Sequence, residues 1–115
     1  MVLASLIDTC KRQLRDSDLM GRVVGAEFAI LLPRTGEQDA AMVAERMRAA
    51  IEEQRVKTER AMISLTASFG VTTIRADDSS VTLLGRADDA LRAAKDGGRN
   101  RVELAPPAPA VPAEA

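Results

Sequence analysis

The chain has 115 residues, of which 46% are apolar, and its 16 lysines and arginines nearly balance its 17 aspartates and glutamates, leaving a net charge of -1. This length is enough for one domain with one core, and the balanced charge argues against a protein that binds nucleic acid through many phosphate contacts. The absence of histidine excludes a histidine-based catalytic triad, an imidazole general base and a histidine-ligated zinc ion, and the single cysteine excludes an intrachain disulfide.

The first predicted elements are a helix and a hairpin. Apolar residues at positions 3, 6, 7, 10 and 14 form one stripe of an amphipathic helix over residues 2–15, and Cys10 on that stripe is expected to be a buried, unreactive thiol. Leu19–Val24 and Glu27–Leu32 predict two strands joined by a tight turn, in which Gly25 suits the positive φ of a type II′ turn. The second strand is continuously apolar, so we expect it to need cover on both faces and neighbours on both sides.

A second helix and a long strand follow. Thr35, with Gln38 three residues later, predicts a capping box, and apolar residues at positions 40, 43, 44, 47, 50 and 51 predict a core-facing helix that ends at about Gln54. The polar residues 54–60 predict a loop. Residues 63–71 alternate between apolar or small residues and polar residues or glycine, which is the pattern of a half-buried strand.

The last elements are a helix, a short strand and a tail. Ser80 is placed to cap a helix whose apolar stripe is at positions 84, 87, 90, 91 and 94, and the glycines at 97 and 98 are expected to end it. Residues 101–104 predict a short strand, and the Pro/Ala-rich residues 105–115 predict a disordered tail after a single domain of residues 1–104. The order α-ββ-α-β-α-β predicts an α+β fold with helices packed on a mixed sheet. No apolar run is long enough to span a membrane and no signal-peptide pattern is present, so we expect a cytoplasmic protein without a membrane segment.

Four short segments stand in the order and spacing of one known family: RDSD (15–18), VGAEF (24–28), LTASFGV (65–71) and ADDALRAAKDGGRNRV (87–102). On these segments the chain resembles the GGDEF domain, the bacterial diguanylate cyclase domain that joins two GTP molecules into cyclic di-GMP. The resemblance covers residues from about 2 to 104. It implies an α/β sandwich of the nucleotide-cyclase or ferredoxin-like type, with a mixed, mainly antiparallel sheet.

The signature motif of the family is degenerate in this chain. Where the family has Gly-Gly-Asp-Glu-Phe, the chain has Val24, Gly25, Ala26, Glu27 and Phe28. The resemblance implies that the third position should be an acidic metal ligand and that the glycines let the backbone approach the triphosphate. The chain therefore lacks the first glycine and the third-position acid.

The family also has a first strand, which carries a second metal-ligating aspartate and would lie ahead of Met1. Since that strand belongs in the middle of the sheet, its absence would leave the strands at 27–32 and 63–71 with unpaired edges. We expect these two strands to close on each other, or a second copy or partner domain to cover them, or the fold to be marginal.

Joining two nucleotides is phosphoryl transfer, which depends on magnesium held by carboxylates and substrate phosphates. Glu27 is the only metal ligand of the family pattern that remains, so no intact catalytic site and no cofactor are expected, and Mg²⁺ would bind only if a missing segment restored activity. The resemblance implies that Gly25, Lys95 and Arg99 contact the GTP phosphates. Alternatively, the two cations simply complement the dipole at the end of a helix.

Arg15 and Asp18 form an RxxD pattern at the position of the family's inhibitory product site, and Arg46 in the segment AER matches a third residue of that site. Arginine can bond to guanine O6 and N7 or pair with phosphate oxygens, and a carboxylate can accept from the guanine N1–H and amino group. The resemblance implies cyclic di-GMP binding at these residues. They could also be vestigial, an arginine at a helix end near a turn aspartate.

The leading hypothesis is a catalytically inactive GGDEF domain that binds cyclic di-GMP or acts as a regulatory interaction module. One alternative is a fragment or subunit of an active diguanylate cyclase, and another is a GTP-binding regulatory module. A structural remnant without a ligand remains the simplest alternative.

Overall fold

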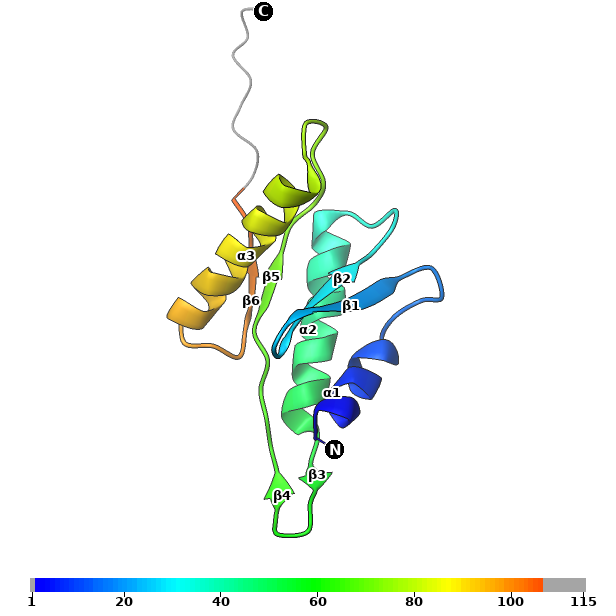
Figure 1. The fold of residues 1–115 in the computed structure, drawn as a ribbon, viewed down its shortest axis with the longest axis vertical. Helices are drawn as coiled ribbons and strands as arrows, with labels where there is room; N and C mark the ends of the chain where they lie inside the picture. Colours follow the sequence, from blue (N-terminus) through cyan, green and yellow to red (C-terminus); the bar gives the residue numbers. More distant parts are fainter. Residues whose placement is uncertain (1, 107–115) are drawn as a thin grey trace, which may run out of the picture.

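The computed structural model describes residues 2–106 and contains three helices and six strands within them (Figure 1). Met1 and the part of the predicted tail from residue 107 onward lie outside the described residues. The elements in chain order are α1 (Val2–Lys11), β1 (Leu19–Val24), β2 (Glu27–Leu31), α2 (Glu37–Glu53), β3 (Val56–Lys57), β4 (Met62–Ile63), β5 (Phe69–Val71), α3 (Ser80–Asp96) and β6 (Val102–Leu104).

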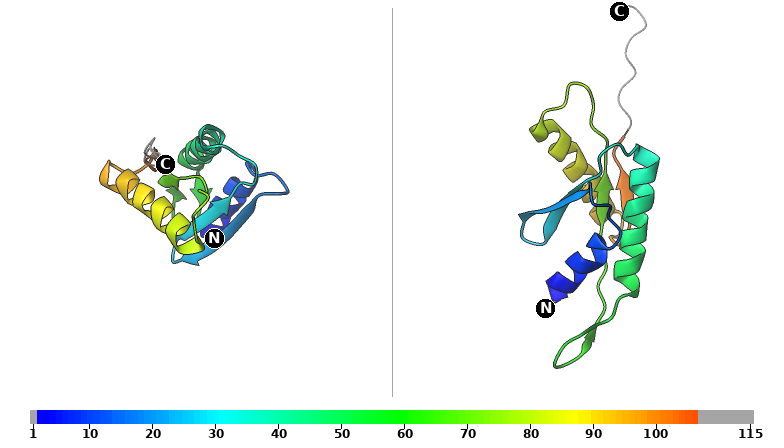
Figure 2. Two further views of the ribbon diagram at one scale, coloured as in Figure 1. Left: turned by 90° about the horizontal axis from the view of Figure 1, so that it is seen from above. Right: turned by 90° about the vertical axis from the view of Figure 1, so that its right-hand side faces the viewer.

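Helix α2 is the centre of the molecule. The β1–β2 hairpin crosses in front of it in Figure 1, and α1 packs beside it. The left view of Figure 2 shows β5 and β6 between α2 and α3, and both strands contact both helices. This pair is therefore covered on its two faces, as expected for a parallel pair of strands.

The strands form three separate two-stranded sheets rather than the single mixed sheet that the sequence predicts. β1 pairs with β2 and β3 with β4, both antiparallel, while β5 pairs with β6 in parallel. The predicted α+β class is confirmed, because helices combine with mainly antiparallel strand pairs. Of the three alternatives for these strand edges, closure of β2 on β5 is wrong, because the two strands do not pair with each other.

The predicted long strand at 63–71 is wrong over its middle. Only Met62–Ile63 and Phe69–Val71 are strands, and residues 64–68 belong to no ladder. A strand needs a neighbour for its backbone N–H and C=O groups, and within residues 2–106 no strand pairs with residues 64–68. The predicted loop at 54–60 is also wrong in part, because β3 lies there and pairs with β4.

The ends of α1 and α2 differ from the sequence prediction. α1 ends at Lys11 instead of continuing to residue 15, because the Arg15 N–H donates to the Asp18 carboxylate at 2.7 Å and turns the chain away from the helix. The predicted capping box of Thr35 and Gln38 is absent: α2 begins after Gly36, which makes no side-chain cap. The Thr35 hydroxyl instead bonds to the segment before the helix.

The cap of α3 and the start of the predicted tail also differ from the sequence prediction. Ser79, not Ser80, caps α3, and it forms a capping box with Thr82. The ordered chain extends past Leu104, because Ala105 is only 6% exposed and donates its N–H to the Val71 carbonyl at 2.8 Å.

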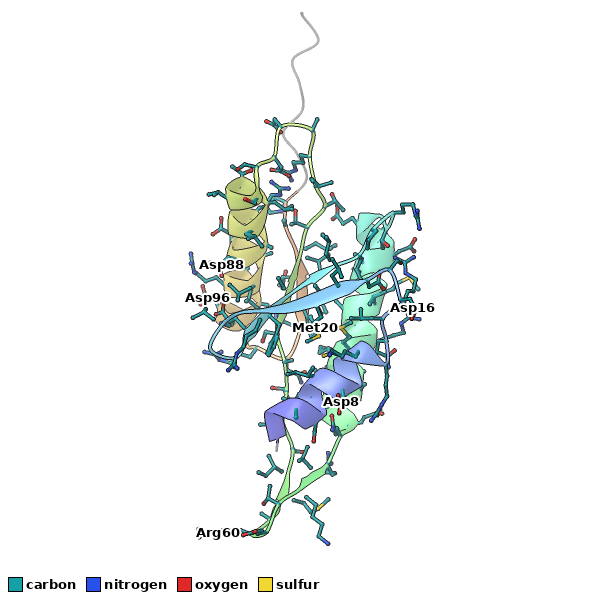
Figure 3. All side chains as sticks on the ribbon, turned by 45° about the vertical axis from the view of Figure 1, so that its right-hand side comes forward. Asp8, Asp16, Met20, Arg60, Asp88 and Asp96 are labelled. Carbon is teal, nitrogen blue, oxygen red and sulfur yellow. The ribbon has the colours of Figure 1, made fainter. Side chains whose placement is uncertain are left out.

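The core lies between the hairpin, α1, α2 and β5. Met47 of α2 is 1% exposed and forms a buried cluster with Ile51 and with Cys10 of α1, whose predicted burial is confirmed. Burial raises the pKa of the Cys10 thiol. Met20 of β1 packs on this cluster, and Figure 3 shows it between the hairpin and α2. The hairpin is thus fixed to α2 by apolar contacts at its base.

Candidate functional site

A pocket of about 270 Å³ lies where the segment after α1, the loop after β2 and the side of α2 meet. Its lining includes Arg15, Asp18 and Arg46, so the fold brings together all three residues that the sequence assigns to a dinucleotide site. The other lining residues are Gln13, Leu32, Arg34, Thr35, Asp39, Met42 and Val43.

Arg15 and Asp18 form a close ion pair at this pocket. The Arg15 Nη2 lies 3.0 Å from Asp18 Oδ1, and its Nε lies 3.3 Å from both carboxylate oxygens. The Asp18 side chain is 3% exposed and that of Arg15 is 57% exposed. Hydrogen bonds from the Arg15 side chain and backbone hold the pKa of Asp18 below its usual value. Asp18 is therefore an ionised carboxylate that orients Arg15, rather than a carboxylate that faces solvent to accept from a guanine.

Two further contacts fix the Arg15 guanidinium. Its Nη2 donates to the Pro33 carbonyl at 2.9 Å and to the Thr35 hydroxyl at 2.8 Å. The Thr35 hydroxyl in turn donates to the Pro33 carbonyl at 3.0 Å. Nη1 takes part in none of these contacts. The guanidinium is thus held on one edge by protein groups, and the other edge can meet a ligand.

Two residues of this pocket, Thr35 and Arg34, are not among the site residues that the sequence predicts. Thr35 matches a helix-cap pattern, and Arg34 belongs to no recognisable motif. Arg34 and Arg46 are both exposed, and neither has a hydrogen-bond or ion-pair partner among residues 2–106. No sequence pattern could have found Arg34, because its place in the pocket depends on how the loop after β2 returns toward Arg15.

The turn within the motif Val24–Phe28 lies on a second, larger hollow. Gly25 has φ +54° and Ala26 is not among the residues with positive φ, which agrees with a type II′ turn. Gly25, Glu27, Lys95 and Arg99 all line a groove of about 2,020 Å³ between the hairpin, α2, β5 and α3. The structure therefore brings the predicted phosphate-binding residues to one groove.

Glu27 is not the isolated carboxylate that the sequence suggests. Lys95 Nζ lies 3.3 Å from Glu27 Oε2, which joins the hairpin to the last turn of α3. Within residues 2–106, no cluster of three or more acidic or cysteine side chains could hold a metal ion. A carboxylate neutralised by a lysine, without further acidic ligands around it, does not fit Mg²⁺, which needs an octahedral set of oxygen ligands.

The turn after α3 is held by a network that the sequence did not indicate. Arg99 and Asn100 have φ values of +63° and +49°. The Asn100 side chain donates to Glu52 at 2.6 Å and accepts from Arg48 at 2.9 Å, both on α2. Its backbone N–H donates to Ser68 at 3.2 Å. These bonds fix the backbone from which Arg99 reaches the groove.

A second arginine–aspartate ion pair lies between β5 and α3. Arg86 donates to Asp78 through Nη2 at 2.6 Å and through Nη1 at 2.9 Å, and the Asp78 side chain is 4% exposed. The Arg86 hydrogen bonds hold the pKa of Asp78 well below its usual range. Arg86 also donates to Thr72 and to the Thr73 carbonyl. This pair closes the loop between β5 and α3 and serves the fold.

The described residues contain no helix that is both long and apolar enough to cross a membrane.

A family model described as "Diguanylate cyclase, GGDEF domain" matches residues 1–101 of the chain. Diguanylate cyclase DgcP of Pseudomonas aeruginosa is 35% identical over 104 residues, which are 90% of this chain and 16% of that protein. Diguanylate cyclase A of Treponema denticola is 37% identical over 103 residues, which are 89% of this chain and 27% of that protein. The chain thus spans about a quarter or less of the length of these two relatives.

Two solved structures are similar to the fold. The diguanylate cyclase SiaD of Pseudomonas aeruginosa, in complex with its activator SiaC, has a TM-score of 0.86 and 39% identity, over 90% of this chain and 40% of that chain. The GGDEF domain of DgcB from Caulobacter crescentus, in complex with c-di-GMP, has a TM-score of 0.85 and 29% identity, over 90% of this chain and 63% of that chain.

Proposed function

Because this chain belongs to the GGDEF family of diguanylate cyclase domains, we propose that it is a catalytically inactive receptor for cyclic di-GMP. Arg15, Asp18 and Arg46 form the binding site, with Arg15 and Arg46 as the ligand-contacting groups. The observation that carries the proposal is the shared pocket: residues 31 positions apart in sequence line one hollow, and Arg15 is already oriented there before a ligand arrives.

The chemistry of Arg15 suits a guanine dinucleotide. A guanidinium is planar, and its parallel N–H groups can bond to guanine O6 and N7 or to two phosphate oxygens. Because Asp18, Pro33 and Thr35 hold one edge of Arg15, binding orders little that is not already ordered. The pocket is at the lower end of the size range of small-molecule sites, so it suits one guanine and an adjacent phosphate, with the rest of the ligand outside.

Catalytic inactivity follows from the groove at the hairpin turn. Ala26 cannot ligate a metal, Val24 places a β-branched side chain where the family has glycine, and Glu27 is paired with Lys95. Without bound magnesium, the groove lacks the divalent charge that would stabilise the transition state of phosphoryl transfer.

The test is isothermal titration of the purified protein with cyclic di-GMP. We expect binding in the micromolar range for the wild type and a loss of about 10- to 100-fold in Arg15→Ala, because a bidentate arginine contact disappears. Arg12→Ala is the matched control, since Arg12 is exposed on the same segment and lies outside the pocket. A folded wild-type protein that does not bind would refute the receptor function.

Lys95 and Arg99 support a second candidate, a GTP-binding regulatory module, because both cations line the groove beside Gly25. A parallel titration with GTP separates the two: tighter binding of GTP, lost in Lys95→Ala and kept in Arg15→Ala, would favour this candidate.

The third candidate, a piece of an active cyclase, has its support in the small share of the relatives that the chain spans. Synthesis of cyclic di-GMP by the longer chain would establish it.

We also propose that a second copy or a partner domain covers the strand edges at the groove. Within residues 2–106, β2 pairs only with β1 and β5 only with β6, so each has an edge that can accept another strand. Sedimentation velocity over a range of concentrations checks for self-association.

A further inference from the structure

Arg34, in the loop after β2, has a backbone conformation that is unusual for its side chain. Its φ is +52°, and within residues 2–106 only Arg99 and Asn100 share a positive φ among the non-glycine residues. Glycine adopts this left-handed region without steric penalty, whereas a long side chain does so at a cost in free energy. Strained residues of this kind cluster at binding sites, where the strain places a functional group.

The loop that carries Arg34 is tied to the guanidinium of Arg15. The carbonyl of Pro33, in the peptide that precedes Arg34, accepts hydrogen bonds from Arg15 at 2.9 Å and from Thr35 at 3.0 Å. The backbone at Arg34 is therefore held in place by side chains that line the pocket. Its side chain lines the 270 Å³ pocket and also the edge of the larger groove, so it lies on the ridge between the two hollows.

The pocket carries more positive than negative charge, which favours an anionic ligand. Three arginines and two aspartates line it. Asp18 is fully engaged by Arg15, so Arg34, Arg46 and Asp39 are the charged side chains that have no ion-pair partner within the described part of the chain. Two free guanidinium groups on one small pocket suit a ligand that carries more than one phosphate charge.

We propose that Arg34 is a further ligand-contacting residue of this pocket and donates to a phosphate of the bound guanine dinucleotide. Its left-handed backbone is what places it there. This inference rests on the proposed receptor function and adds a contact to the three residues already assigned. It also predicts that the pocket prefers cyclic di-GMP, which has two phosphate groups, to GMP, which has one.

The substitution Arg34→Gly separates ligand contact from backbone strain, because the two effects have opposite signs. Removing the side chain relieves the left-handed backbone, so Tm should rise. Removing the guanidinium should raise the Kd for cyclic di-GMP about tenfold and make the Kd less dependent on salt concentration. Arg34→Lys keeps the charge and should retain part of the affinity, although a lysine cannot form the bidentate contact.

Arg12→Gln is the control, since it removes one exposed charge outside the pocket and should leave the Kd unchanged. If Arg34→Gly raises Tm and binds cyclic di-GMP as tightly as the wild type, Arg34 is not a ligand contact. In that case the receptor function still stands, provided that the wild type binds and Arg15→Ala does not. A wild type that binds no cyclic di-GMP overturns both proposals.

Discussion

At the level of single residues, Asp18 and Asp78 each lie beneath an arginine that holds them ionised. Asp18 is covered by Arg15 at the pocket, and Asp78 is covered by Arg86 between β5 and α3. In both pairs the largest cause of the lowered aspartate pKa is the hydrogen bond from the arginine side chain. The same local chemistry therefore orients a guanidinium at the pocket in one place and closes a loop in the other.

The Asp78–Arg86 pair predicts a pH dependence of stability. Because folding lowers the pKa of Asp78 from its usual 3.8, the pair stabilises the fold above about pH 4, and this contribution is lost as the pH falls below that value. Asp78→Asn should therefore lower Tm at pH 7, and its difference from the wild type should shrink as the pH is lowered toward 3. Thermal unfolding followed by circular dichroism measures both effects.

Asp77→Asn serves as the control for this series. Asp77 is exposed beside Asp78 and forms no hydrogen bond or ion pair within the described chain, but its charge acts on Arg86 from a distance, so its substitution should lower Tm at pH 7 much less than Asp78→Asn does. A difference between Asp78→Asn and the wild type that stays constant from pH 7 to pH 3 would contradict the assignment.

At the level of elements, the closest packing is that of α3 on β5. A Cβ atom at Gly70 would overlap with the backbone N of Leu91 and the backbone O of Ala87. Ala90 and Ala94 continue this contact surface and are buried. Small side chains on both partners let the helix approach the strand directly, and this approach positions Lys95 at the end of α3.

Gly70→Ala should destabilise the protein by about 1–3 kcal/mol, because the added methyl group must push α3 away from β5. Gly85→Ala is the matched control. Gly85 lies in α3 itself, and a methyl group added there would meet nothing within 4 Å, so alanine should stabilise the protein by roughly 0.5–1 kcal/mol. Chemical denaturation of both variants measures the two free energies of unfolding, and equal values for them would contradict the packing described.

The elements that sequence reasoning recovered are those whose signals are local. The β1–β2 hairpin follows from Gly25 and its flanking apolar runs, and α2 and α3 follow from apolar residues at helical spacing. The strand at residues 64–68 was predicted wrongly, because alternation shows only that a segment could be a strand, while a ladder depends on a neighbour elsewhere in the chain.

The contacts at the candidate site are also of two kinds: those that the local sequence predicts and those that depend on the packing of distant segments. Arg15 and Asp18 are three residues apart, so their pairing could be expected from the segment RDSD alone. Thr35 and the Pro33 carbonyl reach Arg15 from 20 and 18 residues away. Lys95 meets Glu27 across 68 residues. No local sequence pattern predicts these contacts, because they result from the packing of the hairpin and α3 around α2.

At the level of the whole molecule, two of the three small sheets, β1–β2 and β5–β6, pack on one helix, α2. α2 contacts β5, β6 and α1, and its buried side chains pack against residues of the hairpin. Within residues 2–106, the three sheets do not pair with one another. Residues 64–68 lie between two of these sheets and belong to neither.

This arrangement predicts uneven hydrogen exchange along one segment. The amides of residues 64–68 should exchange at close to the rate of an unstructured peptide, while those of β5 should be protected by pairing with β6. Exchange followed by NMR or mass spectrometry resolves the two groups. Strong protection at 64–68 that weakens on dilution would mean that another copy pairs with the segment, whereas protection independent of concentration would contradict the described ladder.

The β3–β4 hairpin divides the chain into two consecutive halves. It extends away from the rest of the molecule in Figure 1, and Arg60 lies at its tip in Figure 3. In the described part of the chain, β3 and β4 pair only with each other, and the loop between them includes exposed residues. The half that ends in α2 and the half that begins with β5 then meet through side-chain packing. A reporter domain grafted between Glu59 and Arg60 would therefore lengthen this tip while leaving the pocket, the groove and both halves of the core in place.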